Sequence, residues 1–347
     1  MDKAKEIRKG EELDWDQLEA YLRDALPNLE GKFEVKQFHG GHANLTYLLI
    51  FGNKEFVLRR PPFGKIAPGA HDMKREFRVL SKLYKKFPQA PRAFHLCEDQ
   101  DIIGATFVVM ERRQGVVVRY RVPEIFKSYD NVETRLTKAL IRAEADLHTV
   151  DVEAVELTKL GKPEGFLNRQ LGGWIKRWNL SKTGENTDMN EVYEILSQDI
   201  PAPQAVSIVH NDIKFDNCQF QINDPDLVTS IFDWDMTTLG DPLLDFGVTL
   251  SYWQDPRIQE LTNMPVMLHG NFPDKDFLKS IYSEYSGFDL SKISWYESLA
   301  YWKGAVIAQQ LYKRYVDGAT KDNRMALFGE SAKGLAKIAR MIAADVA

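Results

Sequence analysis

Apolar residues in the first part of the chain recur mainly with the period of two that is typical of β-strands. Gly52-Asn53 separates two of these runs and predicts a hairpin turn, and Pro61-Pro62 ends the run that follows. Apolar residues spaced by three and four positions predict helices at 12–25 and 71–87. We expect strands at 33–38, 47–51, 55–59, 94–98 and 106–111, the last two around a turn at Asp99-Gln100-Asp101.

After Gly115 the apolar period becomes that of α-helices, apart from one pair of short strand-like runs. This pair, 218–222 and 228–232, flanks the turn Asn223-Asp224-Pro225-Asp226 and predicts an antiparallel hairpin. We expect helices at 130–150, 166–180, 189–198, 243–254, 275–286, 293–316 and 322–345.

The change of period predicts an α+β fold of two lobes. Residues 1–112 would form a small antiparallel sheet with one main helix, and residues 113–347 a larger, mostly helical lobe. We place the hinge between the lobes at about 111–115. A chain of 347 residues is long enough to give each lobe a hydrophobic core.

Composition and charge narrow the class of protein. The 44% hydrophobic and 27% charged content is ordinary for a soluble globular protein, and the net charge of −5 predicts no general attraction to nucleic acid or anionic membranes. Cys97 and Cys218 show no C-x-x-C spacing, which favours a reducing compartment over a disulfide framework or a zinc site. The longest apolar runs are too short to cross a bilayer, and the first residues lack a signal-peptide core. We therefore expect a cytoplasmic protein.

Polar residues flank the predicted hairpin with a spacing that indicates one site. Asn217 precedes the first strand, Asp233 follows the second, and Asp212 lies on the loop leading in. Because an antiparallel hairpin returns to its starting end, residues at its open end lie roughly 5 Å apart across the ladder. Amide and carboxylate oxygens that converge in this way suit Mg²⁺ carried by a nucleotide triphosphate.

The order H-x-D-x-x-x-x-N, hairpin, D-x-D over residues 210–235 is the arrangement of the catalytic and metal loops of kinases. In detail it resembles the aminoglycoside phosphotransferase family, which has the H-x-D form and an aromatic residue after the metal aspartate, as in Asp233-Trp234-Asp235. The resemblance extends by motif over about residues 30–260 and implies a two-lobed, protein-kinase-like fold. It also implies ATP and Mg²⁺ as cofactors and transfer of the γ-phosphate to an alcohol group.

The resemblance implies roles for the residues of the catalytic loop. Asp212 is the candidate catalytic base, or the residue that orients the acceptor hydroxyl. His210 would support the loop by hydrogen bonding. Lys214 can reach the transferring phosphate, and a solvated lysine is the alternative interpretation.

The metal-binding residues follow from the same resemblance. Asn217 and Asp233 would hold Mg²⁺, and Asp235 would touch a second metal ion or orient the loop. Asp241 is placed to cap a helix, with Asp245 one turn further on, and we interpret both as supports of the catalytic loop.

Nucleotide binding is expected in the sheet lobe. Gly40-Gly41, followed by Asn44 and Thr46, would let backbone N–H groups approach phosphate oxygens, with a plain hairpin turn as the alternative. Arg59 stands where kinases carry a lysine on the third strand, and Glu76 is its expected partner. The alternative is a surface cation and a solvated helix face.

The segment Val108 to Gly115 resembles the strand and hinge that hold adenine in kinases. Backbone groups near Glu111 to Arg113 would hydrogen-bond the base, and Met110 would form a wall of the pocket. An apolar strand end of this kind is also typical of ordinary core.

The acceptor is expected to be a small molecule, because Asp233 and Asp241 are only eight residues apart and leave no room for a peptide-docking segment. The segment around Trp174 is similar to the branch of the family that is fused to, or encoded beside, acyl-CoA dehydrogenases. This similarity implies hydroxy acids or hydroxyacyl-CoA as acceptors and a functional link to acyl-CoA metabolism. Such anions would suit the cations Arg169, Lys176 and Arg177.

Two alternative functions stay open. One is a kinase for aminoglycosides or for other small molecules such as choline or homoserine. The other is a nucleotide-binding pseudokinase with a regulatory role, for which the arginine at position 59 is the only support. The intact Asp212, Asn217 and Asp233 favour an enzyme instead.

Overall fold

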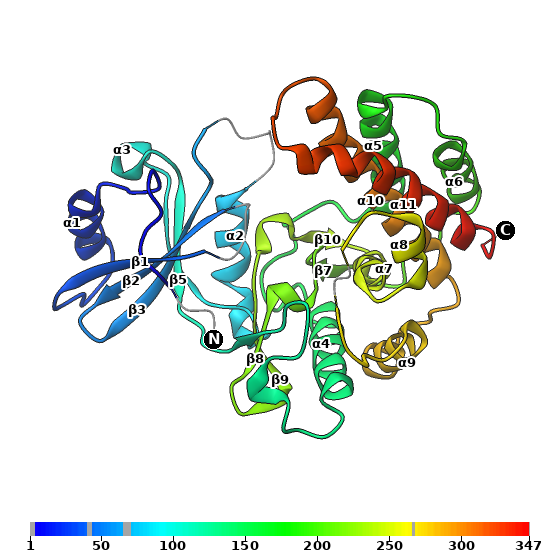
Figure 1. Ribbon diagram of the computed structural model, residues 1–347. Helices are drawn as coiled ribbons and strands as arrows, with labels where there is room; N and C mark the ends of the chain where they lie inside the picture. Colours follow the sequence, from blue (N-terminus) through cyan, green and yellow to red (C-terminus); the bar gives the residue numbers. More distant parts are fainter. Residues whose placement is uncertain (1–3, 40–43, 65–70, 266–267, 347) are drawn as a thin grey trace.

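The computed structural model of the chain describes residues 4–39, 44–64, 71–265 and 268–346. A lobe built on a five-stranded sheet lies at the left of Figure 1, and a larger, mostly helical lobe lies at the right. The two-lobed α+β architecture is therefore confirmed. The residue boundary near 111–115 stays a prediction.

The first lobe contains strands β1 (Phe33–Phe38), β2 (Leu45–Phe51), β3 (Lys54–Arg60), β4 (Ala93–Cys97) and β5 (Phe107–Glu111), with helices α1 (Trp15–Ala25), α2 (Met73–Leu80) and α3 (Gln100–Ile103). The sheet is antiparallel throughout, in the order β1-β2-β3-β5-β4. Each helix begins after an aspartate whose side chain accepts a backbone N–H of the first turn, which satisfies one of the unpaired helical donors. These capping residues are Asp14, Asp72 and Asp99.

The two faces of this sheet belong to different hydrophobic cores. Tyr47 and Leu58 pack on one face with Leu18 and Leu22 of α1. The other face, which includes Val108, packs with α2 into a core that continues through the helical lobe. Full burial of such a side chain stabilises the fold by about 1.5–3 kcal/mol. The shared core therefore holds α2 between the sheet and the second lobe.

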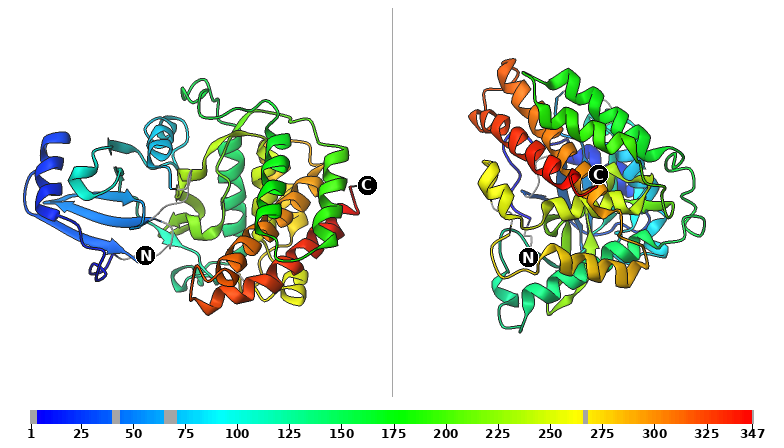
Figure 2. Two further views of the ribbon diagram at one scale, coloured as in Figure 1. Left: turned by 90° about the horizontal axis from the view of Figure 1, so that it is seen from above. Right: turned by 90° about the vertical axis from the view of Figure 1, so that its right-hand side faces the viewer.

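The helical lobe contains α4 (Val132–His148), α5 (Phe166–Ser181), α6 (Thr187–Gln198), α7 (Pro242–Tyr252), α8 (Pro256–Leu261), α9 (Lys275–Ser286), α10 (Ile293–Val316) and α11 (Phe328–Ala343). The long helix α10 packs against α5, α7 and α11, as the two views of Figure 2 allow the reader to follow. Trp295 and Trp302 on α10 are fully buried. Their indole N–H groups donate to the carbonyls of Leu196 and Met189, each at 3.0 Å, so burial leaves neither donor unpaired.

Two small sheets carry the motif loops. The hairpin strands β8 (Cys218–Gln221) and β9 (Asp224–Ile231) are joined by β6 (Val116–Val117), and β7 (Ser207–Val209) pairs with β10 (Thr238–Gly240). Gly115 leads into β6, where an added Cβ would lie 2.7 Å from the carbonyl oxygen of Phe220. The close approach of hinge and hairpin therefore requires glycine at this position.

Some boundaries differ from the sequence expectations. The 71–87 helix ends at Leu80 and is followed by a 3-10 turn at Leu83–Lys85, and the expected turn at 99–101 is the capped start of α3. The hairpin turn falls at 222–223, because irregularities in the β8–β9 register let β9 start at Asp224. Helix 322–345 is a 3-10 turn, Asn323–Leu327, followed by α11. The short elements β6, β7, β10 and α8 are too brief to show a period.

Both cysteines are buried and free, with Cys97 in β4 of the first lobe and Cys218 in β8 of the second. Among the helices of the described residues, none is both long and apolar enough to cross a bilayer.

Candidate active site

A buried carboxylate clamps the loop that carries His210 and Asp212. Asp245 on α7 accepts the backbone N–H groups of His210 and Asn211, at 2.5 and 2.6 Å. Asn211 has a φ of 71°, in the left-handed region that asparagine enters more readily than most other non-glycine residues. The two hydrogen bonds to Asp245 hold this turn in place.

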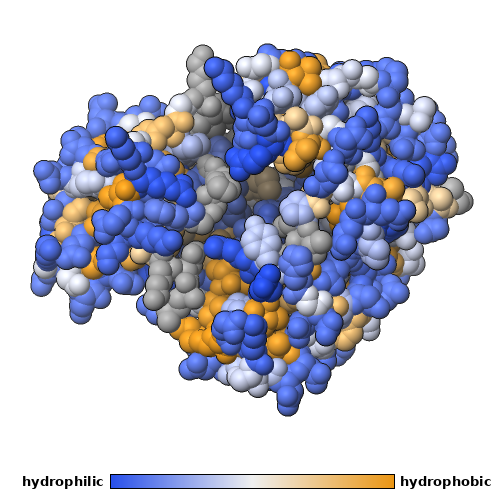
Figure 3. Space-filling view, in the orientation of Figure 1, coloured by the Kyte–Doolittle hydropathy of each residue, from blue (hydrophilic) through white to orange (hydrophobic). Residues whose placement is uncertain are grey.

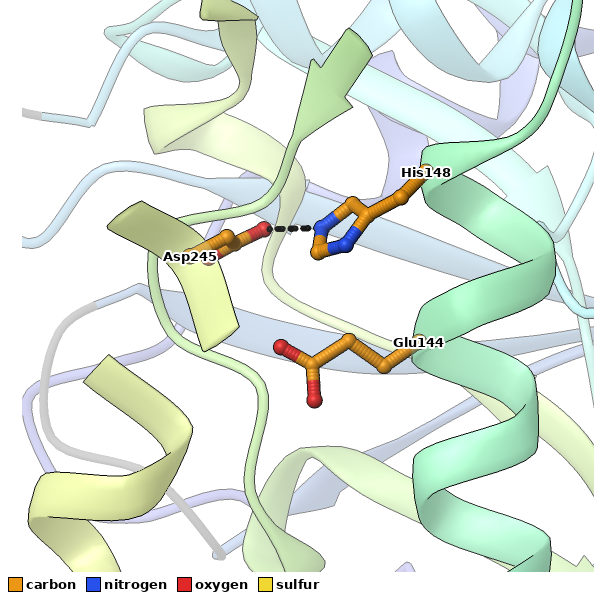
Figure 4. A group of neighbouring side chains, drawn as sticks. All are labelled: Glu144, His148 and Asp245. Carbon is orange, nitrogen blue, oxygen red and sulfur yellow. Dashed lines mark hydrogen bonds and ion pairs between the residues drawn. The ribbon is translucent and has the colours of Figure 1, made fainter. Parts of the chain in front are cut away.

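Asp245 is held in turn by His148 of α4, whose Nε2 lies 3.1 Å from Oδ2 of the carboxylate. Glu144, one helical turn earlier, points toward the same place (Figure 4) and accepts a hydrogen bond from Thr249 at 2.8 Å. Burial raises the pKa of Glu144 well above its ordinary value, and the charge of Asp245 adds to this effect. Burial also opposes ionisation of Asp245, but the hydrogen bond and charge of His148 keep the pKa of Asp245 below its ordinary value.

The potential ligand atoms of Glu144, His148 and Asp245 lie within 4.8 Å of one another. We do not assign a metal centre to this group, because the donor atoms of His148 and Asp245 already have partners and only Oε2 of Glu144 has none. The Nδ1 of His148 lies 2.7 Å from the hydroxyl of Tyr282, and both oxygens of Asp245 accept hydrogen bonds. We interpret the group as support for the catalytic loop. Glu144 and His148 escaped the sequence analysis, although an acidic residue on an apolar helix face was a usable signal.

The carboxylate of Asp212 is held by three donors. Nζ of Lys214 lies 2.9 and 2.8 Å from its two oxygens, and Nδ2 of Asn217 donates to Oδ2 at 2.8 Å. The hydroxyl of Tyr252 donates to Oδ1 at 2.8 Å. Burial raises the pKa of Tyr252 well above its ordinary value and Asp212 raises it further, so the phenol stays a donor. No spacing in the sequence linked Tyr252 with this loop.

Asn217 and Asp233 flank the open end of the hairpin. The backbone N–H of Phe232, the residue before Asp233, donates to the carbonyl of Asn217 at 2.8 Å. The Nε2 of His210 lies 2.7 Å from the carbonyl of Phe232, which ties the catalytic loop to the same strand end. Asp233 has a φ of 68°, which turns the chain sharply after β9.

Arg59 of β3 joins two acidic side chains from different parts of the chain. One nitrogen of its guanidinium donates to Glu76 of α2, and Nη2 donates to Asp233 at 2.6 Å. Burial disfavours the charge of Arg59, but Glu76 and Asp233 outweigh burial and raise the pKa of Arg59. Burial likewise opposes ionisation of Asp233, and Arg59 outweighs it, so the pKa of Asp233 is lowered. Burial dominates at Glu76, whose pKa is raised to about 7.

The remaining predicted phosphate-side residues lie along the edge of the first lobe. Thr46 is opposite Arg59 in the β2–β3 ladder. Nδ2 of Asn44, the residue before β2, lies 3.4 Å from Oδ2 of Asp235. This contact connects the first lobe to the segment that follows β9. Burial raises the pKa of Asp235, and the like charge of Asp233 adds to the effect. Gly40 and Gly41 lie outside the described residues.

The predicted hinge residues occupy the end of β5. Met110 is buried in the core that the two lobes share. The backbone N–H of Glu111 donates to the carbonyl of Arg92 at 2.8 Å, and the carboxylate of Glu111 pairs with Arg113 at 3.1 Å. The backbone N–H and the carboxylate of Glu111 therefore already have partners close to this strand end.

The oxygens at the hairpin end fit a Mg²⁺ ion. The Nδ2 of Asn217 donates to the carbonyl and the carboxylate of Asp212, at 2.9 and 2.8 Å, which fixes the orientation of the amide. Within the described residues nothing donates to Oδ1 of Asn217, so this oxygen is left to accept a cation. Asp233 and Asp235 add carboxylates whose mutual repulsion a divalent cation would relieve.

A family model described as the phosphotransferase enzyme family matches residues 34–264. The chain belongs to this family. The match contains the loop of Asp212, the hairpin and Arg59, and it ends before α9, α10 and α11.

Relatives of this phosphotransferase include longer proteins. Acyl-CoA dehydrogenase family member 10 of Mus musculus is 27% identical over 345 residues, which cover 96% of this chain and 31% of the relative. Acyl-CoA dehydrogenase family member 11 of Homo sapiens is 27% identical over 341 residues, covering 96% of this chain and 43% of the relative. The chain thus spans less than half the length of these relatives.

Solved structures confirm the kinase-like fold. A putative aminoglycoside phosphotransferase from Ralstonia eutropha has a TM-score of 0.80 and 28% identity, over 96% of this chain and 99% of that one. A complex of an aminoglycoside phosphotransferase with GDP and kanamycin has a TM-score of 0.64 and 15% identity, over 94% and 98% of the two chains. Choline kinase of Cryptosporidium parvum has a TM-score of 0.59 and 12% identity, over the same shares.

A small pocket adjoins the loop that carries Asp212. Lys214 and Tyr252, both partners of Asp212, line it together with Trp253 and Leu268. Figure 3 shows a hollow between the two lobes in this orientation.

The three cations expected on the acceptor side have different surroundings. Arg169 donates to the carbonyls of Lys162 and Glu164 and so supports the loop before α5. The side chain of Lys176 is exposed. The guanidinium of Arg177 stacks on Trp174, 4.4 Å from the ring centroid.

Proposed function

We propose that this phosphotransferase moves the γ-phosphate of ATP to the hydroxyl of a small molecule, with Asp212 as the base. One observation carries the proposal: the carboxylate of Asp212 is oriented by Lys214, Asn217 and Tyr252 beside a pocket. The same Asn217 stands next to Asp233 across the hairpin end. An acceptor hydroxyl and a nucleotide phosphate can therefore meet at this point.

In the proposed reaction, the acceptor oxygen forms a bond to the γ-phosphorus while the bond from phosphorus to the β–γ bridging oxygen breaks. Asp212 orients the hydroxyl and takes its proton, and ADP leaves with the bridging oxygen. The transition state is loose, so positioning and neutralisation of charge dominate the catalysis. Bound Mg²⁺ would supply much of that neutralisation. Lys214, held 2.8 Å from Asp212, is placed to add a positive charge beside the transferring group.

Arg59 is proposed to bind phosphate oxygens of ATP in place of the more usual lysine. A guanidinium offers five donors in one plane, so it can keep its bond to Glu76 and still present N–H groups to a phosphate. The contact with Asp233, at 2.6 Å, puts these N–H groups beside the proposed metal ligand. This arrangement supports an active enzyme over a pseudokinase, because the arginine is integrated with the metal loop.

We propose a hydroxy acid or a hydroxyacyl-CoA as the acceptor. The relatives named as acyl-CoA dehydrogenase family members support a link to acyl-CoA metabolism. Arg177 and Lys176, exposed on the α5 segment, favour an anion over a polycationic aminoglycoside. The structure with kanamycin is 15% identical and carries the fold alone, whereas the 28% identical structure is named only as a putative aminoglycoside phosphotransferase, so aminoglycosides stay in the test as the alternative.

The test is ATP consumption by purified protein with Mg²⁺ and a panel of acceptors. The panel contains short- and medium-chain hydroxy acids, hydroxyacyl-CoAs, choline, homoserine and aminoglycosides, and Asp212→Asn runs beside the wild-type protein. We expect turnover with hydroxyacyl compounds and a loss of at least about 10²-fold in kcat for Asp212→Asn, with ATP affinity retained. If only aminoglycosides were phosphorylated, they would replace hydroxyacyl compounds as the assigned acceptor. ATP binding without turnover of any acceptor would favour the pseudokinase.

A further inference from the structure

Two cations from different helices converge on one aromatic ring of the helical lobe. The guanidinium of Arg177, on α5, lies 4.4 Å from the ring centroid of Trp174. The ammonium of Lys303, on α10, lies 5.6 Å from the same centroid. The indole N–H of Trp174 donates to Gln170 at 3.1 Å, which fixes the plane of the ring.

In the described part of the chain these cations have no acidic partner. Among the described residues, no carboxylate lies within ion-pair distance of Arg177 or Lys303, whereas Arg142 on α4 has Asp146 at 3.9 Å. Burial lowers the pKa of Lys303, and the negative charges of Asp245 and Asp212 oppose this effect. The half-buried ammonium of Lys303 has no counter-ion among the described residues, which is unfavourable in the empty protein and favours a site for an anion beside the exposed Arg177.

The face of α5 beside Arg177 has unoccupied space next to two glycines. Gly172 and Gly173 lie in the interior of α5, where glycine destabilises a helix relative to alanine. A Cβ added at Gly172 would meet nothing within 4 Å, and one at Gly173 would meet only the guanidinium of Arg177, at 3.7 Å. Packing within the chain therefore does not require either glycine. Gly173 and Arg177 are four residues apart and share a helix face, so the open space adjoins the cations.

We propose that Arg177, Lys303 and the ring of Trp174 form the subsite that binds the anionic group of the phosphoryl acceptor, with Gly172 and Gly173 leaving room for its chain. This subsite rests on the proposed function, since it positions an acceptor whose hydroxyl is directed to Asp212. The bound group is an oxyanion, either the carboxylate of a hydroxy acid or a phosphate of its CoA thioester. Guanidinium and ammonium groups bind both oxyanions by charge-assisted hydrogen bonds.

The experiment compares Arg177→Gln and Lys303→Gln with wild-type protein in steady-state phosphoryl transfer. The probes are hydroxy acids, their CoA thioesters and their neutral primary amides. We expect each variant to raise the acceptor KM for the charged probes by about tenfold, with kcat and the ATP KM within about twofold. The KM for the amides should not change. A raised KM for the free acids would identify the carboxylate as the bound group. A raised KM for the thioesters alone would identify the CoA phosphates.

The matched control is Arg142→Gln, which removes another exposed arginine stacked on an aromatic ring, 5.5 Å from the centroid of Tyr285. Arg177 is exposed, so its variant tests the subsite even if Lys303→Gln folds poorly. Gly172→Ala gives an independent test, since a methyl group in the open space should raise the acceptor KM while the helix gains stability. Arg177→Lys should recover part of the lost affinity.

Binding measurements separate failure of the subsite from failure of the proposed function. The acids and amides are titrated into protein loaded with ADP and Mg²⁺. Acids that bind to wild-type protein, lose affinity in both variants and are never phosphorylated would support the subsite and contradict the acceptor assignment. Equal KM values for acids and amides, unchanged values in both variants, or no binding of any anionic probe would overturn the subsite. The first two results would leave the phosphotransferase function standing.

Discussion

Arg59 and Asp233 are joined directly, with Nη2 2.6 Å from Oδ1, although they lie 174 positions apart in the chain. The other guanidinium nitrogen donates to Glu76, so one planar group connects β3, α2 and the turn after β9. Such a fork cannot be reproduced by an ammonium group, which is a single point of charge. Strand β3, which we propose contributes to nucleotide binding, and the proposed metal ligand are therefore positioned by the same side chain.

The first prediction concerns this fork. Arg59→Lys should raise the ATP KM by about tenfold and lower kcat, because one ammonium cannot hold Glu76, Asp233 and a phosphate together. Steady-state kinetics with varied ATP measure both effects. Arg135→Lys is the matched control, since Arg135 forms a two-pronged pair with Asp226 on the exposed surface. An unchanged ATP KM would show that Arg59 makes no contact with the phosphates.

The second prediction concerns the metal ion. Asp233→Asn should raise the Mg²⁺ concentration needed for half-maximal rate by about tenfold or more, because an amide oxygen is a weaker ligand for a hard cation. Chelation of Mg²⁺ should abolish turnover of the wild-type protein. Initial rates over a Mg²⁺ titration give the comparison, with Asp276→Asn, whose side chain is 91% exposed, as the control. Identical titration curves for the two proteins would contradict a metal role for Asp233.

The third prediction concerns Tyr252. Its hydroxyl donates to Asp212 at 2.8 Å, and a hydrogen bond to a charged group contributes about 1.5–3 kcal/mol. Tyr252→Phe should therefore lower kcat by about tenfold or more and leave nucleotide affinity unchanged. Kinetics and an ADP titration test the two statements, with Tyr285→Phe on the surface of α9 as the control. A normal kcat would mean that Lys214 and Asn217 suffice to position the carboxylate.

The fourth prediction concerns pH and Glu144. The pKa of Glu144 in the folded protein lies well above the ordinary 4.5, so the folded chain binds more protons than the unfolded chain above that pH. Its contribution to stability is complete below about pH 4.5 and is lost as the pH rises through the folded pKa. Glu144→Gln keeps an oxygen that can accept the hydrogen bond of Thr249, but its side chain no longer binds or releases a proton.

We therefore expect Glu144→Gln to gain stability relative to wild type between about pH 5 and pH 8, by at most about 1.4 kcal/mol for each pH unit. Urea unfolding at both pH values measures the difference. Glu153→Gln, on the segment after α4, is the control for a general change in net charge. A difference that is constant with pH would show that Glu144 ionises normally in the folded chain.

Local spacing accounts for the parts of the site that could be predicted. Asn217 and Asp233 are separated by a hairpin, and a hairpin brings its ends together whatever the rest of the fold does. The same holds for the cap of α7 by Asp241, which depends on neighbouring residues only. These features needed no knowledge of tertiary packing.

Tertiary packing decided the features that sequence could not supply. Tyr252 reaches Asp212 from 40 positions away, and Lys303 meets Trp174 across the contact of α10 with α5. A helical period indicates that a residue faces the core or solvent, but it does not say which other helix it faces. His148 and Glu144 look like ordinary helix residues until the position of Asp245 is known.

The two buried cysteines have a practical consequence for following motion in this protein. Cys97 lies in the sheet of the first lobe and Cys218 at the start of the hairpin in the second, and both are shielded from solvent. A thiol reagent can reach either sulfur only when the surrounding structure opens. Each single-cysteine variant would thus report the opening of its own lobe through its labelling rate. If added nucleotide slows the labelling of one cysteine and not of the other, the lobe that contains the slowed cysteine is the one that nucleotide stabilises against opening.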